Sequence, residues 1–238
     1  MFANVANMKN LFFENPNDAR KLAQAMVDIG KHMHRDTRAH LTNMDQPLGL
    51  AIGNSLEVKE AIATLNGKGP SDLYELCIEA GETMLIQAKI AKTKKEANEM
   101  LVKHLKDGSA LQQLVKMVDA QHGDSSYILH PEKFPLAKHI VDVKATESGY
   151  LNKINALELG EASMRLGGGR ATKDDIIDYA AGILINKKCG DYVNKGDVLA
   201  TLHTNHDDYT QQIKEIEDAF KLGAVKGTYY PIIFDTVE

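Results

Sequence analysis

Histidines are the first residues in this sequence that could do chemistry, because nine of them are present. His203 and His206 have a spacing that a metal ion could use, but neither a cysteine nor a second histidine pair accompanies them. His32 and His34 are two residues apart and would diverge by about 200° on a helix. We therefore interpret the histidines as surface or core residues rather than as ligands of a transition metal.

The two cysteines, Cys77 and Cys189, are far apart in the sequence and show no metal-binding spacing. Cys77 lies in the apolar run Leu-Cys-Ile, which predicts a buried, reduced thiol rather than a nucleophile. The run Gly167–Arg170 (GGGR) could form an anion-binding nest. It lacks the glycine and lysine spacing of a phosphate loop and does not follow a predicted strand, so a helix-terminating turn is the favoured interpretation.

The segment from Gly190 to Leu199 reads GDYVNKGDVL and predicts a strand, a tight turn and a second strand. Gly196 would supply the turn residue with positive φ. The same spacing is typical of biotinyl and lipoyl domains. Those carriers also need an exposed lysine for modification, and no lysine here has such surroundings. The segment therefore predicts a domain of that shape, an α/β hammerhead, without its cofactor.

The elements that must position these residues follow from hydrophobic periodicity. Up to about residue 125 the chain is mainly helical, and from there strands and helices alternate, so the predicted fold class is mixed α/β. Helices are predicted over 17–34, 55–65, 71–90, 94–106, 109–121, 156–166 and 207–221, and strands over 37–44, 139–143, 149–154, 183–185, 191–193, 198–202 and 228–234.

Length and composition exclude several classes of protein. The chain has 238 residues, which allows one large domain or two small ones, and its net charge of −5 argues against a basic nucleic-acid-binding surface. No apolar run approaches the roughly 18–20 residues of a membrane span. The first residues have no basic segment followed by an apolar one, as a secretion signal would. We expect a cytoplasmic protein without nucleic-acid or membrane partners.

The run from Asn43 to Ala61, NMDQPLGLAIGNSLEVKEA, carries a family resemblance. It closely resembles the central motif of the pyrimidine-nucleoside phosphorylases, the thymidine phosphorylase family. Further matching motifs lie at 67–76, 167–170 and 175–193, and the resemblance extends from about Asp18 to Glu238. One departure from the pattern is His34, which occupies a position where the family usually has glycine.

The resemblance implies a pentosyltransferase that acts in pyrimidine salvage. In this family, phosphate attacks C1′ of uridine, thymidine or deoxyuridine and releases the base and a pentose 1-phosphate. It also implies that residues 1–125 are the C-terminal part of the central α/β domain, and that 126–238 form the C-terminal hammerhead domain. The full-length family is homodimeric, and its substrates are a pyrimidine nucleoside and phosphate.

The resemblance further implies a site for a potassium-like cation. Its ligands here would be the backbone carbonyls of Leu48 and Ala51 and the carboxylate of Glu60. Such a cation prefers oxygen ligands, and Gly49 and Gly53 would let the loop turn its carbonyls inward. The alternative is that Glu60 is an ordinary helix-surface carboxylate. Because the family's remaining ligands belong to its phosphate loop, we expect half a site in this chain.

The family's phosphate-binding and base-binding residues lie ahead of the matched region. We therefore assign no catalytic or substrate-binding residue within this sequence, expect no organic cofactor, and expect the chain alone to be inactive. An alternative is a non-catalytic binding or structural module derived from the family. An adjacent reading frame that encodes a phosphate loop would favour the enzyme.

Overall fold

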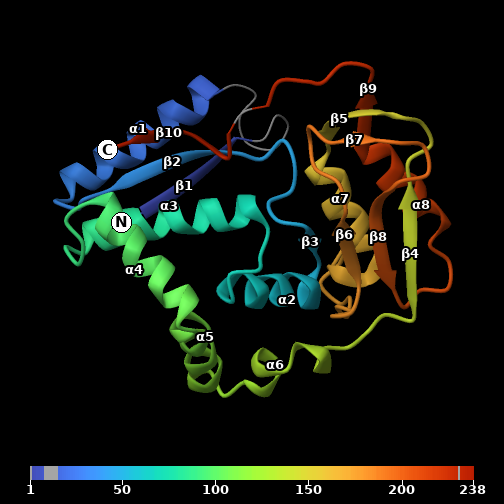
Figure 1. Cartoon of the computed structure of the whole chain (residues 1–238), viewed down its shortest axis with the longest axis horizontal. Coiled ribbons are helices and arrows are strands. Elements are labelled where there is room, and N and C mark those ends of the chain that lie inside the picture. Colours follow the sequence, from blue (N-terminus) through green and yellow to red (C-terminus); the bar gives the residue numbers. More distant parts are fainter. Residues whose placement is uncertain (1, 8–15, 230) are drawn as a thin grey trace. The chain divides into compact units, whose positions relative to one another are not determined.

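A computed structural model describes residues 2–7, 16–229 and 231–238 (Figure 1). The chain folds into two compact units. The first unit comprises Met1–Asp45, Pro70–Ala110 and Tyr230–Glu238, and the second comprises Gln46–Gly69 and Leu111–Tyr229. Each unit is described by itself.

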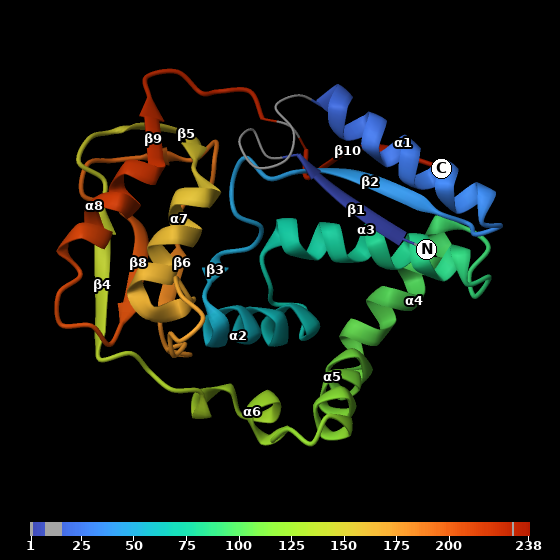
Figure 2. The same ribbon diagram turned by 180° about the vertical axis from the view of Figure 1, so that it is seen from behind.

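The first unit is built around a three-stranded sheet of order β1-β2-β10 (Figures 1 and 2). β1 runs parallel to β2, and α1 connects them, whereas β10 is antiparallel to β2. Ala19, Ala23 and Val27 of α1 are buried against Leu41 and Val237 of the sheet, as expected of one face of an amphipathic helix. Its elements are β1 (Phe2–Asn7), α1 (Pro16–His32), β2 (Arg38–Asn43), α3 (Ser71–Gln87), α4 (Lys94–Lys106) and β10 (Ile233–Val237).

The second unit contains two antiparallel sheets, with strand orders β3-β6-β8-β4 and β7-β5-β9. A single core of buried aliphatic residues, among them Leu151, Ile183, Leu202 and Ile216, packs between these strands and two helices, α7 and α8. Its elements are β3 (Ala51–Ile52), α2 (Asn54–Leu65), α6 (Ser126–Leu129), a 3₁₀ turn (Pro131–Lys133), β4 (His139–Lys144), β5 (Gly149–Ile154), α7 (Ala156–Ser163), a π-turn (Met164–Gly168), β6 (Gly182–Ile185), β7 (Tyr192–Val193), β8 (Val198–Thr204), α8 (Thr210–Ala219) and β9 (Phe220–Gly223), and α5 (Ser109–Ala120) begins in the first unit and ends here.

The mixed α/β class is confirmed, and most predicted elements lie within a few residues of their expected bounds. Gly196 has φ 94°, which confirms the predicted turn residue. Strand β1 was not predicted, and two predicted elements have wrong bounds. The helix predicted over 207–221 ends at Ala219, because Phe220 turns into the core and pairs with Ile154 as part of β9. The strand predicted over 228–234 begins only at Ile233.

The predicted burial of Cys77 is also wrong, since the thiol is exposed. On α3 the buried positions are Glu82 and Thr83. Thr83 contacts His40 of β2 and Glu82 accepts a hydrogen bond from Asn98 of α4, and Cys77 lies on another side of the helix. Among the described residues, no helix is both long enough and apolar enough to cross a bilayer.

Candidate functional site

The loop 46–53, between β2 and α2, folds back onto the side chain of Glu60. Glu60 Oε1 accepts a hydrogen bond of 2.7 Å from the Leu50 amide. Gly49 has φ 69°, and a Cβ atom placed there would lie 2.1 Å from Glu60 Oε2. Only glycine therefore fits at this position, because both the backbone conformation and the close approach of the carboxylate exclude a side chain.

The Ala51 carbonyl lies at the edge of a sheet. Leu50 O accepts a 2.7 Å hydrogen bond from Ile185 N, and Ala51 is paired with Leu184 in the antiparallel register of β3 and β6. Because antiparallel pairs alternate, the N–H and C=O of Ala51 point away from β6. Pro47 O, one residue before Leu48, accepts a hydrogen bond from the Lys188 ammonium. Together, Glu60 of α2 and the loop offer one carboxylate and backbone oxygens, the kind of donor that a potassium-like cation takes. Two of these oxygens, those of Pro47 and Leu50, already accept hydrogen bonds from Lys188 and Ile185.

The start of α2 is fixed by polar contacts from both sides. Gly53, with φ 122°, is the N-cap, and its N–H donates to Glu57 Oε1 at 2.9 Å. Asn54 Nδ2 donates to Gly168 O at 2.9 Å, which connects α2 to the Gly167–Arg170 turn. Two motifs that the sequence analysis treated separately are therefore neighbours in the second unit.

The Gly167–Arg170 turn terminates a helix, as predicted. Gly167 has φ 109°, which ends α7 and its π-turn, and its carbonyl accepts from Asp178 N. The N–H groups of Ala171 and Thr172 donate to Asp175 Oδ2, at 2.9 and 2.8 Å. The Thr172 hydroxyl also bonds this carboxyl and, with these amides, lowers the pKa of Asp175. The amides that follow the glycines thus donate their hydrogen bonds to the carboxylate of Asp175 within the same chain.

A groove of about 1080 Å³ is lined by residues of α2 and of the segment 118–135. Val58 and Ala61 form part of its lining, opposite the segment that includes α6 and the 3₁₀ turn. Tyr127 and Phe134 meet edge to face with ring centroids 5.2 Å apart, and the Lys59 ammonium lies 5.7 Å from the Phe134 centroid. This groove was not predicted from the sequence, although Val58 and Ala61 lie three residues apart on one helix face.

Two family models match the chain. The glycosyl transferase family a/b domain matches residues 1–111, and the pyrimidine nucleoside phosphorylase C-terminal domain matches residues 150–223. The chain belongs to the pyrimidine-nucleoside phosphorylase family. It is similar to the pyrimidine-nucleoside phosphorylases of Geobacillus stearothermophilus (44% identity over 95% of this chain), Staphylococcus epidermidis (47% over 87%) and Bacillus subtilis (46% over 90%). These matches cover 52%, 46% and 49% of the three relatives, so the chain spans about half their length.

The departure from the family pattern at His34 lies in the turn that follows α1. His34 lies two residues after the end of α1 and has φ 53°, in the left-handed region that glycine adopts without strain. Its amide donates to Lys31 O and so closes the last turn. The backbone therefore keeps the conformation that the family pattern predicts, even though the residue is not glycine.

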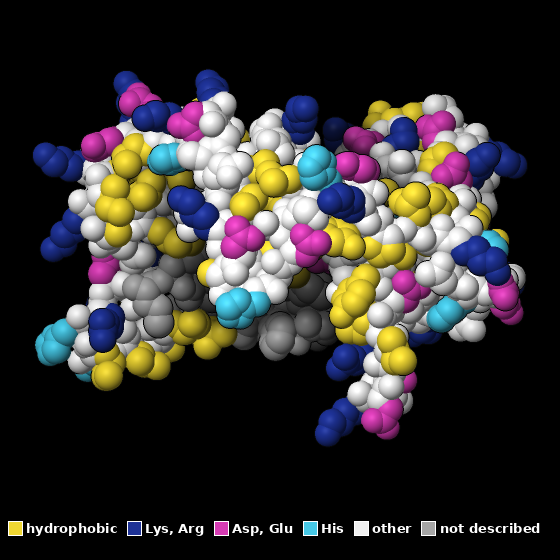
Figure 3. Space-filling model, turned by 90° about the horizontal axis from the view of Figure 1, so that it is seen from below, with side chains coloured by type: hydrophobic (Ala, Val, Ile, Leu, Met, Phe, Trp, Pro, Cys, Tyr) yellow, Lys and Arg dark blue, Asp and Glu magenta, His cyan; other side chains and the backbone are white. Residues whose placement is uncertain are grey.

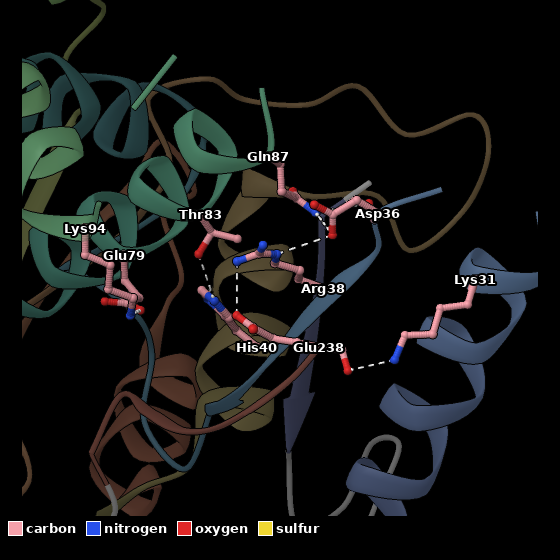
Figure 4. Close-up of polar contacts among 9 residues, drawn as sticks. All are labelled: Lys31, Asp36, Arg38, His40, Glu79, Thr83, Gln87, Lys94 and Glu238. Carbon is pink, nitrogen blue, oxygen red and sulfur yellow. Dashed lines mark hydrogen bonds and ion pairs between the residues drawn. The ribbon is translucent and has the colours of Figure 1, made fainter. Parts of the chain in front are cut away.

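A second group of polar residues, in the first unit, was not singled out from the sequence (Figure 4). His40 of β2 lies 3.2 Å from the Thr83 hydroxyl of α3 and is almost fully buried. Arg38 contacts Asp36 and, at 3.1 Å, the carboxylate of Glu238. This polar cluster joins β2, α3 and the C-terminal residue. Among the described residues, no group of three or more His, Cys, Asp or Glu side chains could hold a metal ion.

Proposed function

We propose that this chain is the C-terminal portion of a pyrimidine-nucleoside phosphorylase. A phosphate oxygen would form a bond to C1′ of the nucleoside while the C1′–N bond breaks. The electron pair of that bond leaves with the base, which takes up a proton, and the products are the base and a pentose 1-phosphate. The observation that carries this proposal is the 44–47% identity to proteins of that name over at least 87% of the chain.

The contribution of the loop 46–53 would be a partial site for a potassium-like cation. Its ligands would be the carbonyls of Leu48 and Ala51 and the carboxylate of Glu60. The contact of the Glu60 carboxylate with the loop and the outward direction of the Ala51 carbonyl support this assignment. When bound, the cation would hold the loop in place beside the phosphate-binding part of the complete enzyme, whose full-length form we expect to be a homodimer.

For the domain organisation we propose the family division, with residues 1–125 in the central α/β domain and 126–238 in a hammerhead domain of the biotinyl type. Support comes from the two antiparallel sheets that share one core in the second unit. The match of the C-terminal family domain to residues 150–223 lies within the proposed hammerhead domain.

We further propose that the chain alone does not catalyse phosphorolysis, because the residues that bind phosphate and base in the family are not among its matched motifs. Holding phosphate and nucleoside in a reactive geometry can supply about 7–11 kcal/mol of the barrier. The purified chain, assayed by ultraviolet absorbance with uridine or thymidine at saturating phosphate, should release no base. Addition of the amino-terminal part of a relative should restore turnover.

Turnover by the chain alone, in a preparation free of host phosphorylase, would contradict the proposed inactivity and would mean that a site within these residues does the chemistry. Absence of turnover in every combination with an amino-terminal part would contradict the enzyme proposal and favour a non-catalytic module.

A further inference from the structure

One side of α1 presents apolar side chains to solvent. Leu22, Met26, Ile29 and Met33 follow one another at intervals of four, three and four residues, which places them on one side of a helix. Leu22 is 42%, Ile29 64% and Met33 68% exposed. Met33 belongs to this helical turn, because its amide donates to Ile29 O. We call these four residues the α1 stripe.

The α1 stripe is separate from the face by which α1 packs on its own sheet. That face consists of Ala19, Ala23 and Val27, which are fully buried, and only Met26 of the stripe also contacts this core. The sheet thus covers only part of the apolar surface of α1. Hydrophobic groups also remain visible between charged side chains on the face drawn in Figure 3, so α1 is not the only element with exposed apolar atoms.

The sheet beneath α1 ends at β1. Its order is β1-β2-β10, and within the described part of the chain β1 pairs with β2 alone. β1 and β2 are parallel and joined through α1, as in an α/β domain. Sheets of this kind are normally covered by helices on both faces, and an open edge strand is a template for another strand. Among its described residues, the first unit thus has an open sheet edge as well as an apolar helix face.

The length of the relatives indicates what covers these surfaces. The chain matches 46–52% of the three relatives, so about half of each relative's polypeptide lies outside the match. We infer that the α1 stripe and the open edge of β1 receive the amino-terminal part of the family's polypeptide, which packs an apolar helix on the stripe and adds a strand along β1. This inference rests on the proposed function, and it holds whether that part is joined to this chain or separate. A second copy pairing through α1 would leave the edge of β1 open.

Co-expression tests the inference. The chain is produced together with the amino-terminal part of the Bacillus subtilis relative, and the mixture is analysed by size-exclusion chromatography with light scattering. We expect a one-to-one complex. The double variant Leu22→Lys/Ile29→Lys should weaken the complex by about tenfold or more. A few buried apolar side chains carry most of the binding free energy of an interface, and this variant replaces two of them with charged ones. Ile176→Lys is the matched control: Ile176 is 93% exposed but lies in the second unit, and its variant should bind normally.

A fusion protein provides a second test in case the separately produced amino-terminal part does not fold. The same Bacillus part is fused ahead of this chain, and a cysteine introduced as Ile29→Cys is alkylated in the fusion and in the chain alone, with the rates read by peptide mass spectrometry. Alkylation at position 29 should slow by about tenfold in the fusion, as expected for a thiol that leaves solvent. A cysteine at position 176 should react equally in both.

Equal alkylation at position 29 in the two proteins overturns the inference, and so does a homodimer of the chain alone that Leu22→Lys/Ile29→Lys dissociates. Failure of this inference can be told apart from failure of the proposed function. A complex that binds through the α1 stripe but releases no base sustains this inference and contradicts the enzyme. Restored turnover, with the cysteine at position 29 still fully reactive, supports the enzyme and contradicts this inference.

Discussion

At the scale of single residues, Glu60 shows how a side chain expected to bind a cation also holds its own loop. Its carboxylate accepts from the Leu50 amide and lies against Gly49, so the loop depends on it even before any cation binds. The family motif predicts a role for Glu60 in cation binding, but its hydrogen bond to Leu50 could be learned only from the fold.

Replacing Glu60 should therefore cost stability as well as any cation affinity. We expect Glu60→Ala to lower the free energy of unfolding by about 1–3 kcal/mol, because the part-buried Leu50 N–H loses its acceptor. Glu60→Gln should retain most of this stability, since its amide oxygen can still accept. Glu75→Ala, at an exposed position of α3, is the control and should change stability by less than about 0.5 kcal/mol. Urea denaturation measures all three, and equal effects at positions 60 and 75 would refute the role of Glu60 in the loop.

The burial of His40 is expected to make the stability depend on pH. Burial lowers the pKa of His40 from its usual 6.5, and Lys94 and Arg38 act in the same direction against Glu79 and Glu238. The unfolded state therefore binds the proton more readily than the folded state.

Stability should thus be full above about pH 6.5 and decrease as the pH falls through this value towards the lowered pKa of the folded state. His40→Gln removes the titrating group while keeping a polar side chain opposite Thr83. Denaturation between pH 5 and 8 should give a shallower pH dependence for this variant than for the unmodified chain. The pKa of His203 is also lowered by burial, so part of the slope should remain. An unchanged slope would exclude His40 as its source.

At the scale of elements, the end of α1 is determined by a backbone conformation rather than by the residue found there. His34 has φ 53°, which costs a residue with a side chain about 1–2 kcal/mol relative to the usual helical conformation. Glycine adopts it without this cost but loses more entropy on folding.

We therefore expect His34→Gly to stabilise the chain by about 0.5–1 kcal/mol, the difference between relieved strain and added chain entropy. Ala25→Gly, on the exposed side of α1 in its interior, introduces the same residue where φ is helical and should destabilise by about 1 kcal/mol. Opposite signs in thermal denaturation are the expected result. A loss of stability with both variants would mean that the side chain of His34 contributes more than its backbone conformation costs.

At the scale of the whole molecule, the two units have separate cores. Leu41 belongs to the core of the first unit and Leu151 to that of the second, and both side chains are fully buried. Nothing in the local sequence around either residue shows which core it joins, because each core is assembled from distant segments.

Substitutions in the two cores should consequently affect different unfolding transitions. Leu41→Ala and Leu151→Ala should each cost about 2–5 kcal/mol through lost burial and the cavity that remains. Differential scanning calorimetry should show two transitions, of which Leu41→Ala lowers one and Leu151→Ala lowers the other. A single transition shifted alike by both variants would show that the units unfold together.

The sequence by itself determined most of the helices, several strands and the family, and it predicted which residues would form a cation site. Helical periodicity fixed α1, α2 and α4 nearly to the residue, and the glycine at position 196 marked its turn, because these signals are local. The motif around Gly49 and Glu60 is likewise contiguous enough to be recognised without a structure.

Only the tertiary structure decided which faces are covered. It exposed Cys77, which lies in an apolar run, and buried Glu82 and Thr83 on the same helix, because β2 and α4 pack against those positions and not against Cys77. It also turned Phe220 from a predicted helix into a strand, since pairing with Ile154 and burial in the core outweigh helix propensity there. A pattern in sequence states which residues share a face, but burial depends on segments far along the chain that come to lie against it.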